Sequence, residues 1–418
     1  MPHPRPRFCL AEFKRKLNFQ RVVLVQGVRQ CGKSFFLREL FCQHHPDVAY
    51  VTLDQPSEKN FALNNPETFL KRLGEFRTVI IDEAQKAPAL FDAVKYMVDL
   101  NSKPGQYVLS GSTEFSLKNN IRESLTGRAT TLRLYPLTLA EALKQNHTDV
   151  RIFPQKITNT SANRSQFIRH LTQGGMPGIF SVHTKSEHRD LILDWLSLTT
   201  QRDIQQLPGG KKDSQLAMNI LQQIALLEEP TAVEIAKSLE VNARKINSHI
   251  DALKSLFAIT ELPPSNLGTG KSRFFHCDVS FATYFGATFK RQIETLYLQE
   301  LLSYKANSDH DAINSLTYYR TTKGSVVDFL FTNQENRTIC IKIHDKETVN
   351  QGDLRNILNL EKKINGPVEL ICAAGVTREQ NLTGVRIVPW ESVSSIQIQP
   401  STNKITLDPS ESKHLAKS

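Results

Sequence analysis

The fold of this chain is decided by one stretch, VVLVQGVRQCGKSFF, which runs from Val22 to Phe36. It begins as an apolar, β-branched run, continues as Gly-x-x-x-x-Gly-Lys-Ser from Gly27 to Ser34, and ends in a segment with helical patterning. A strand before this motif and a helix after it are the context in which it forms a phosphate-binding loop. Glycine at both ends lets the backbone curl so that its N–H groups point at an anion. The stretch therefore predicts an α/β fold with the parallel sheet of a P-loop nucleotide-binding domain.

The same loop predicts how ATP and Mg²⁺ would be held. Lys33 would reach the β- and γ-phosphates, and the Ser34 hydroxyl would bind Mg²⁺. The helix that begins near Lys33 offers unpaired N–H groups and the positive end of its dipole to the same anion. The residues predicted to contact the nucleotide are Gly27, Val28, Arg29, Gln30, Cys31, Gly32, Lys33, Ser34 and Phe35.

A second strong signal is the segment RTVIIDEAQ, from Arg77 to Gln85. An apolar run that ends in two acids is typical of a buried parallel strand, which delivers its carboxylates to the sheet edge where ligands bind. Asp82 would hold the water shell of Mg²⁺, and Glu83 would act as general base on the attacking water. Together with the loop, this segment predicts ATP hydrolysis.

Two further polar features would complete such a site. The apolar segment Tyr107–Gly111 is followed by Ser112 and Thr113, and either hydroxyl would face the γ-phosphate or the attacking water. An arginine would stabilise charge on the transferring phosphate, from the same chain or from a neighbouring subunit. Arg128 is the preferred candidate for this role, and Arg29, within the loop itself, is its rival.

Composition restricts the class of protein. The chain has 418 residues, more than one ordinary core holds, so two or three domains are expected. Its net charge of +10 would attract polyanions, of which nucleic acid is the usual one. Six scattered cysteines without a C-x-x-C pair predict a reducing, cytoplasmic compartment and argue against a structural zinc site. No stretch approaches the ~18 apolar residues of a membrane span, and the N-terminus lacks the apolar core of a signal peptide, so no membrane partner is expected.

A helix-turn-helix pattern lies in the middle of the chain. Thr231 and Glu234 form a capping-box pair at the start of one helix, and a second helix follows from Ala243. The open face of the second helix is predicted to carry Arg244, Lys245, Asn247 and His249. With the strand that returns after it, the unit is similar to a winged helix. It would either place its second helix in the major groove of DNA or serve as a joint between domains, and the small number of fixed cations favours the joint.

The C-terminal part predicts a helix, a β-hairpin and a strand that ends in Lys342, which is the layout of the PD-(D/E)-x-K nuclease fold. That chemistry needs carboxylates that hold Mg²⁺ and a lysine near the attacking water. Asp328 and Lys342 are present, but Cys340 stands where an acid is expected, and a thiol is a poor ligand for Mg²⁺. Glu294 or Glu300 would supply a carboxylate only if the geometry allows. The sequence therefore favours a nuclease-like fold without nuclease activity.

Taken as a whole, the sequence resembles the prokaryotic AAA-like ATPases in which a nucleotide domain is joined to a C-terminal domain of unknown function. Besides the loop and the acid pair, the resemblance is carried by Ser110-Gly111-Ser112, Leu125-Thr126-Gly127-Arg128, Pro136-Leu137-Thr138, Gly174-Gly175-Met176-Pro177 and Arg202-Asp203-Ile204. It implies an ATPase domain with a parallel sheet, a lid, a winged helix and a nuclease-like C-terminal fold. Val28 departs from the family pattern, which often has proline there.

These inferences divide the chain into five expected parts. They are a P-loop ATPase domain (1–145), a helical lid or linker (160–215), a winged-helix-like domain (216–268), a nuclease-like α/β domain (269–400) and a flexible tail (401–418). We expect an ATP-binding protein whose Mg²⁺-dependent hydrolysis acts as a regulatory switch. The alternative is a DNA-binding module under ATP control. A protein partner or a homo-oligomer is compatible with either.

Overall fold

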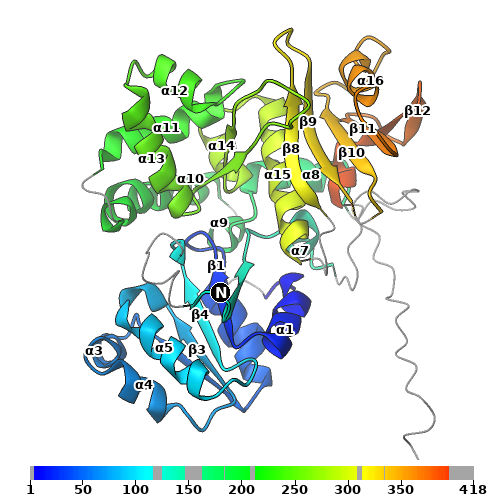
Figure 1. The fold of residues 1–418 in the computed structure, drawn as a ribbon. Coiled ribbons are helices and arrows are strands. Elements are labelled where there is room, and N and C mark those ends of the chain that lie inside the picture. Colours follow the sequence, from blue (N-terminus) through cyan, green and yellow to red (C-terminus); the bar gives the residue numbers. More distant parts are fainter. Residues whose placement is uncertain are drawn as a thin grey trace, which may run out of the picture.

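The computed structural model describes residues 4–115, 125–145, 162–182, 184–207, 212–307, 313–333 and 335–394. Figure 1 shows two lobes: the first part of the chain, in blue and cyan, forms the lower lobe, and the rest, in green to orange, forms the upper one. The predicted phosphate-binding loop lies where the lobes meet, close to α9 (Pro177–Phe180). Residues 146–161, which precede most of the predicted lid or linker, and the whole predicted tail, 401–418, lie outside the described residues.

The lower lobe is built on a five-stranded, fully parallel sheet with the order β2-β3-β4-β1-β5. Its strands are β1 (Val22–Gln26), β2 (Val48–Thr52), β3 (Thr78–Asp82), β4 (Tyr107–Gly111) and β5 (Ala129–Arg133). The strands β1, β3 and β4 are buried along their whole length, as expected for apolar strands that helices cover on both faces. The predicted α/β fold class with a parallel P-loop sheet is therefore confirmed.

Helices pack on both faces of this sheet. Apolar side chains of α1 (Cys9–Phe19) and of the helix after the loop pack on one face. Those of α3 (Pro56–Asn64), α4 (Pro66–Arg72) and α5 (Ala89–Leu100) pack on the other. The helix after the loop is continuous but irregular, with α2 (Lys33–Phe35), a π-helical η1 (Phe36–Phe41) and a 3-10 turn η2 (Cys42–His44).

The strand order decides which residues meet at the sheet edge. Strand β4 lies between β1 and β3, so one extra strand separates the strand before the loop from the strand that ends in the acids. Because the strands run in the same direction, their carboxyl ends share one edge. The loop after β1, the acids at the end of β3 and the hydroxyl groups after β4 therefore lie along one edge of the sheet.

Short helices connect the two lobes. They are α7 (Leu139–Ala142), α8 (Arg164–Gln173), α9, α10 (Lys185–Ser197), the π-helical η5 (Leu198–Asp203) and the 3-10 turn η6 (Ile204–Gln206). Both α7 and α8 begin with a complete capping box, from Thr138 to Glu141 and from Asn163 to Gln166. These caps fix where the chain re-enters helix after each loop.

The next unit has three helices and a two-stranded hairpin: α11 (Ser214–Leu226), α12 (Ala232–Ser238), α13 (Ala243–Ser255), β6 (Ile259–Leu262) and β7 (Arg273–His276). The hydroxyl of Thr231 caps α12 as the sequence predicts. However, β6 pairs antiparallel with β7. A domain boundary between 268 and 269 would separate these two paired strands, so the hairpin belongs to one unit and the expected boundary is misplaced.

The last part contains a six-stranded mixed sheet with the order β12-β13-β11-β10-β9-β8. Its strands are β8 (Asn314–Arg320), β9 (Val326–Thr332), β10 (Thr338–Ile343), β11 (Val368–Ala374), β12 (Gln380–Leu382) and β13 (Val385–Pro389). The long helix α15 (Phe289–Asn307) packs on one face and α16 (Arg355–Glu361) on the other, while α14 (Val279–Tyr284) precedes α15. Within the described residues, no helix combines the length and the apolar content that a membrane span requires.

Candidate functional site

The loop between β1 and α2 has the backbone that a phosphate cradle requires. Gly32 has a φ of 95°, in the left-handed region that glycine adopts most easily. A Cβ added to Gly27 would lie 2.2 Å from the Leu134 carbonyl oxygen, so only glycine fits there. The buried Lys33 Nζ donates to the Gly27 carbonyl at 2.9 Å and to the Val28 carbonyl at 3.1 Å. Its ammonium group thus lies across the loop, where it can meet phosphate oxygens.

Ser34 and Asp82 meet at a third side chain that the sequence analysis did not identify, Tyr50 on β2. The Tyr50 hydroxyl donates to Asp82 Oδ2 at 2.7 Å and lies close to Ser34. Burial and the Asp82 charge raise the pKa of Tyr50, so its hydroxyl stays protonated as a donor. One hydroxyl and one carboxylate, completed by water ligands, suit Mg²⁺. Nothing in the sequence around Tyr50 signals this contact, which arises because its strand pairs with β3.

Glu83 has a conformation and an environment typical of a functional residue. Its φ of 57° is left-handed, which is uncommon for a residue with a side chain and is found most often at functional sites. Burial raises the pKa of the Glu83 carboxyl, while the nearby charge of Lys33 acts in the opposite direction. A carboxylate with a raised pKa accepts a proton more readily, as a general base must.

A pocket of about 240 Å³ opens beside these acids and brings together residues from both lobes. Glu83, Ser112 and Thr113 line it from the sheet edge. Since both hydroxyl-bearing residues line the pocket, the choice between Ser112 and Thr113 stays open. Arg29 and Arg202 line the same pocket. The rival arginine of the loop is therefore close to the predicted catalytic residues.

Arg128 lies at the opposite edge of the sheet. Its carbonyl oxygen accepts from the N–H of Val22, the first residue of β1, and its guanidinium donates to Asp99 at 2.6 and 2.9 Å. The five residues of β1 separate this end from the loop by roughly 16 Å at ~3.3 Å per residue. The prediction that Arg128 acts on a phosphate bound to its own chain is therefore wrong. A role toward a neighbouring subunit stays a prediction.

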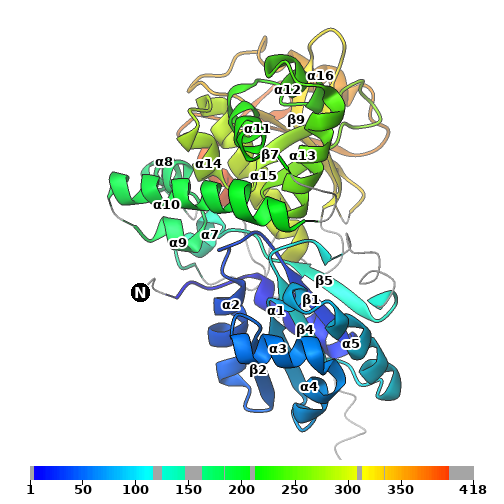
Figure 2. The ribbon, with the colours of Figure 1, turned by 90° about the vertical axis from the view of Figure 1, so that its left-hand side faces the viewer.

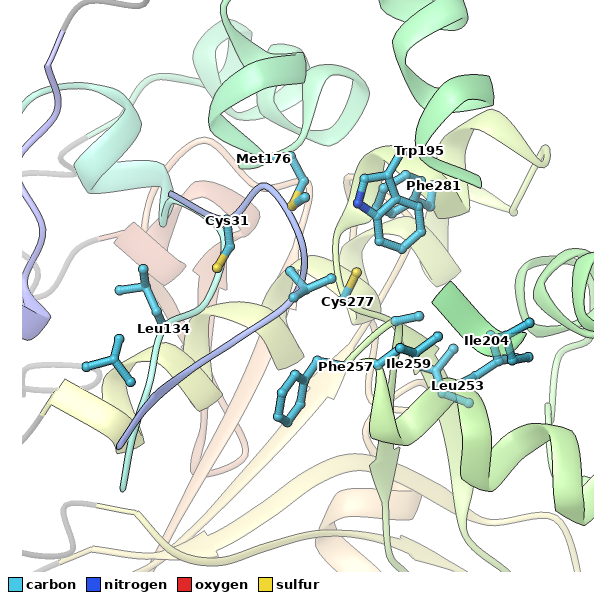
Figure 3. Close-up of a cluster of buried hydrophobic side chains, with 14 of the residues drawn as sticks. Cys31, Leu134, Met176, Trp195, Ile204, Leu253, Phe257, Ile259, Cys277 and Phe281 are labelled. Carbon is cyan, nitrogen blue, oxygen red and sulfur yellow. The ribbon is translucent and has the colours of Figure 1, made fainter. Parts of the chain in front are cut away.

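The loop is also held from the upper lobe. One nitrogen of the Arg29 side chain donates to both carboxylate oxygens of Asp203 at 2.8 Å, and Trp195 Nε1 donates to the Arg29 carbonyl at 3.2 Å. Figure 3 shows Cys31, Met176, Trp195 and Phe281 in the same cluster of buried side chains. In the sequence, Arg202-Asp203 stands out only as part of a family motif, and its contact with the loop is not predicted. The nucleotide loop and the upper lobe therefore share one apolar core.

The motif Gly174-Gly175-Met176-Pro177 has its structural reason at this junction. The Gly175 N–H donates to Asp278 Oδ2 at 2.7 Å, and its carbonyl accepts from the Leu137 N–H at 2.7 Å. A Cβ on Gly174 would lie 1.9 Å from Asp278 Oδ1, and one on Gly175 would lie 2.1 Å from the Leu137 carbonyl oxygen. Both glycines are therefore required for this close approach of backbone and carboxylate.

A family model for an AAA domain matches residues 19–143, which contain the parallel sheet and the loop. Two domains of unknown function follow, DUF8612 over residues 164–290 and DUF4143 over residues 289–393. The chain joins an AAA domain to a C-terminal DUF4143 domain. The DUF8612 match spans the expected lid and the three-helix unit with its hairpin.

The relatives do not extend this assignment to an activity. Uncharacterized proteins of Mycobacterium tuberculosis and Mycobacterium bovis are each 24% identical over 271 residues, 64% of this chain and 56% of theirs. The chain thus spans little more than half the length of these relatives. An uncharacterized protein of Methanocaldococcus jannaschii is 23% identical over 197 residues, 45% of this chain and 43% of its own. A solved STAND ATPase with a tetratricopeptide repeat sensor from Pyrococcus horikoshii covers 73% of this chain and 49% of its own, at 14% identity and a TM-score of 0.27.

In the DUF4143 domain, the predicted acids do not form a set that is ready for a metal. Asp328 and Glu294 are buried side by side, and Glu294 Oε2 accepts from Arg273 at 2.8 Å. Although burial opposes it, the charges of Arg273 and Lys290 hold the pKa of Glu294 well below its usual range, whereas burial raises that of Asp328. The pair is therefore surrounded by cations and is not held as two free carboxylates. Glu300 takes no part, because its carboxyl accepts from the N–H of Leu139 in α7.

One other side chain differs from its predicted position. His249 lies on the buried face of α13, and its Nε2 accepts from the Asp213 N–H. It therefore does not belong to the open face of that helix. Lys245 pairs with Asp213 at 3.0 Å. These contacts weaken the case for DNA contact by α13.

Cys340 is buried in the apolar core on the α16 side, and burial raises the pKa of its thiol to about 12, which agrees with its exclusion as a metal ligand.

Proposed function

We propose that the AAA domain binds ATP with Mg²⁺ and hydrolyses it, and that the upper lobe responds to the state of the nucleotide. The observation that carries this proposal is the meeting of Lys33, Ser34, Asp82 and Glu83 at the carboxyl edge of a parallel sheet. The AAA match supports the ATPase class, and the roles of single residues follow from their contacts.

Each residue has a role that its position supports. The backbone N–H groups of the loop and the Lys33 ammonium would bind the β- and γ-phosphates. The Ser34 hydroxyl and, through water, Asp82 would hold Mg²⁺, which when bound supplies positive charge to the phosphate oxygens. Glu83 would take the proton of the attacking water, and Ser112 or Thr113 would orient that water or the γ-phosphate.

The regulatory part of the proposal rests on Arg29. Its side chain is bound by Asp203 and its carbonyl by Trp195, so a change in the loop acts directly on two elements of the upper lobe. A γ-phosphate in the adjoining pocket would compete with Asp203 for the Arg29 guanidinium, because both are anions that bind the same donor. Binding of ATP would thereby loosen the contact, and hydrolysis would restore it.

The test is ATP turnover by phosphate release with saturating ATP and Mg²⁺. Glu83→Gln keeps the shape of the side chain but removes the base, so we expect turnover to fall by about 10²- to 10⁴-fold while ATP binding is retained. Lys33→Ala should lose both affinity and turnover. Glu58→Gln, in the same domain but in an exposed ion pair with Arg72, is the matched control and should keep the wild-type rate. Equal rates in all four proteins would refute hydrolysis at this site.

A further inference from the structure

A second pocket lies outside the nucleotide site, among α8, α10 and α14. These three helices lie next to one another in the upper lobe (Figure 2). The pocket has a volume of about 850 Å³, within the ~300–1,000 Å³ range of small-molecule sites. None of the residues predicted to bind ATP lines it. The proposed ATPase function therefore leaves this pocket unexplained.

The charge of the pocket is one-sided. Among its described lining residues, Arg169, Lys185, His188 and Arg189 are basic and none is an aspartate or a glutamate. The spacing in α10 explains the segregation, since Lys185, His188 and Arg189 are three and four residues apart and share one helix face. The ion pairs of the described residues do not include Lys185 or Arg189. Both cations are exposed at the pocket and can bind an anion.

One acid lies close behind the pocket and has to be accounted for. Asp278 is fully buried, and its oxygens accept from the Ser280 N–H and hydroxyl and from the Gly175 N–H. Burial raises the pKa of Asp278, while these hydrogen bonds act in the opposite direction. The carboxylate is therefore bound by its own donors, and Asp278 is not among the residues that line the pocket.

The remaining lining supplies an apolar surface for a ring. Tyr284 and Phe285 line the pocket, are half-buried, and meet edge to face with their centroids 5.2 Å apart. Partly exposed aromatic rings next to guanidinium groups are the combination that binds a planar base together with its phosphates. We propose that this pocket binds a phosphorylated small molecule with an aromatic ring, of the nucleotide class, independently of the loop at Gly27–Ser34.

The experiment separates this pocket from the ATP site by working in the full-length Lys33→Ala protein. Calorimetric titration with ADP should detect a residual site whose affinity falls as salt is raised. Adding Lys185→Glu and Arg189→Glu should weaken that site at least tenfold. The control adds Lys237→Glu and Lys305→Glu, two exposed cations away from the pocket, and should leave the residual affinity unchanged. Unchanged thermal midpoints would show that all variants are folded, and Arg189→Gln offers a milder second variant.

Several outcomes would overturn the proposal. One is that the Lys33→Ala protein binds no ADP. Another is that the charge-reversal protein and the control protein bind ADP with equal residual affinity. Titration with inorganic pyrophosphate tests whether the ligand's aromatic ring contributes to binding. If it does, ADP should bind at least several-fold more tightly than pyrophosphate. Equal affinity for the two would remove the ring from the ligand class. Tighter binding of a single-stranded oligonucleotide, lost in the same charge-reversal variant, would assign the pocket to nucleic acid instead. All of these binding results are independent of whether the AAA domain hydrolyses ATP.

Discussion

Replacing Asp203 by asparagine should uncouple the nucleotide loop from the upper lobe. One nitrogen of Arg29 lies 2.8 Å from both Asp203 oxygens, and the two side chains are 31% and 13% exposed. A buried charge-assisted hydrogen bond contributes about 1.5–3 kcal/mol and an exposed ion pair about 0–1 kcal/mol. For this partly exposed pair we expect a coupling free energy of about 1–2 kcal/mol between Arg29 and Asp203.

A double-mutant cycle measures that coupling directly. The four proteins are the wild type, Arg29→Gln, Asp203→Asn and the double variant, unfolded in urea and followed by tryptophan fluorescence. Fluorescence is suitable because Trp195 donates to the Arg29 carbonyl and so reports on this contact. The cycle between Arg128 and Asp99, whose carboxylate is 39% exposed, is the control in the same domain and should give a smaller coupling. Effects of Arg29→Gln and Asp203→Asn that simply add, within about 0.3–0.5 kcal/mol, would refute the reasoning.

Four further predictions follow from single contacts. Tyr50→Phe removes the hydroxyl that donates to Asp82, so the Mg²⁺ concentration for half-maximal ATP turnover should rise about tenfold; an unchanged Mg²⁺ dependence would contradict this. Gly27→Ala should abolish ATP binding in calorimetry and lower the thermal midpoint, because its Cβ would lie 2.2 Å from a carbonyl oxygen. Arg128→Ala should leave the turnover of dilute, monomeric protein within about twofold of wild type, since removing a surface side chain costs little; a loss restored at high protein concentration would favour action between subunits. Burial raises the pKa of Glu300 to about 8, so its stabilising contribution is complete below the ordinary pKa near 4.5 and is lost as pH rises through about 8; urea unfolding at several pH values should show this slope in wild type and a flatter one in Glu300→Gln.

The local features of the AAA domain could be predicted because each is encoded in a short segment. The apolar strand, the glycine loop and the acids after β3 are adjacent in sequence, and a parallel sheet brings its strand ends to one edge whatever the loops between them do. For that reason Asp82 and Ser34 could be assigned to one site before the strand order was known. The extra strand β4 carried Ser112 to the same edge by the same rule.

The failures concern residues whose position depends on contacts far apart in sequence. Arg128 precedes β5, and the direction of that strand places it at the amino edge of the sheet, away from the loop. The polar ring of His249 is predicted to be exposed, yet it is buried. The Asp213 N–H, at the start of α11, donates to it there and so satisfies its polar atom. Asp203 and Tyr50 reach the site from other elements, and nothing in their own neighbourhood signals that contact. Motif spacing predicts strand ends well and tertiary partners poorly.

The close approach at Gly175 means that the AAA domain is not autonomous, although its sequence ends well before that residue. A fragment that stopped at residue 145 would leave the Leu137 N–H without its acceptor and would uncover Val28, Cys31 and Leu134, which are now at most 3% exposed. Such a fragment would expose apolar surface next to the predicted phosphate-binding loop, whose conformation ATP binding would require. The AAA domain and the helices that cover it should consequently be produced together, as one piece.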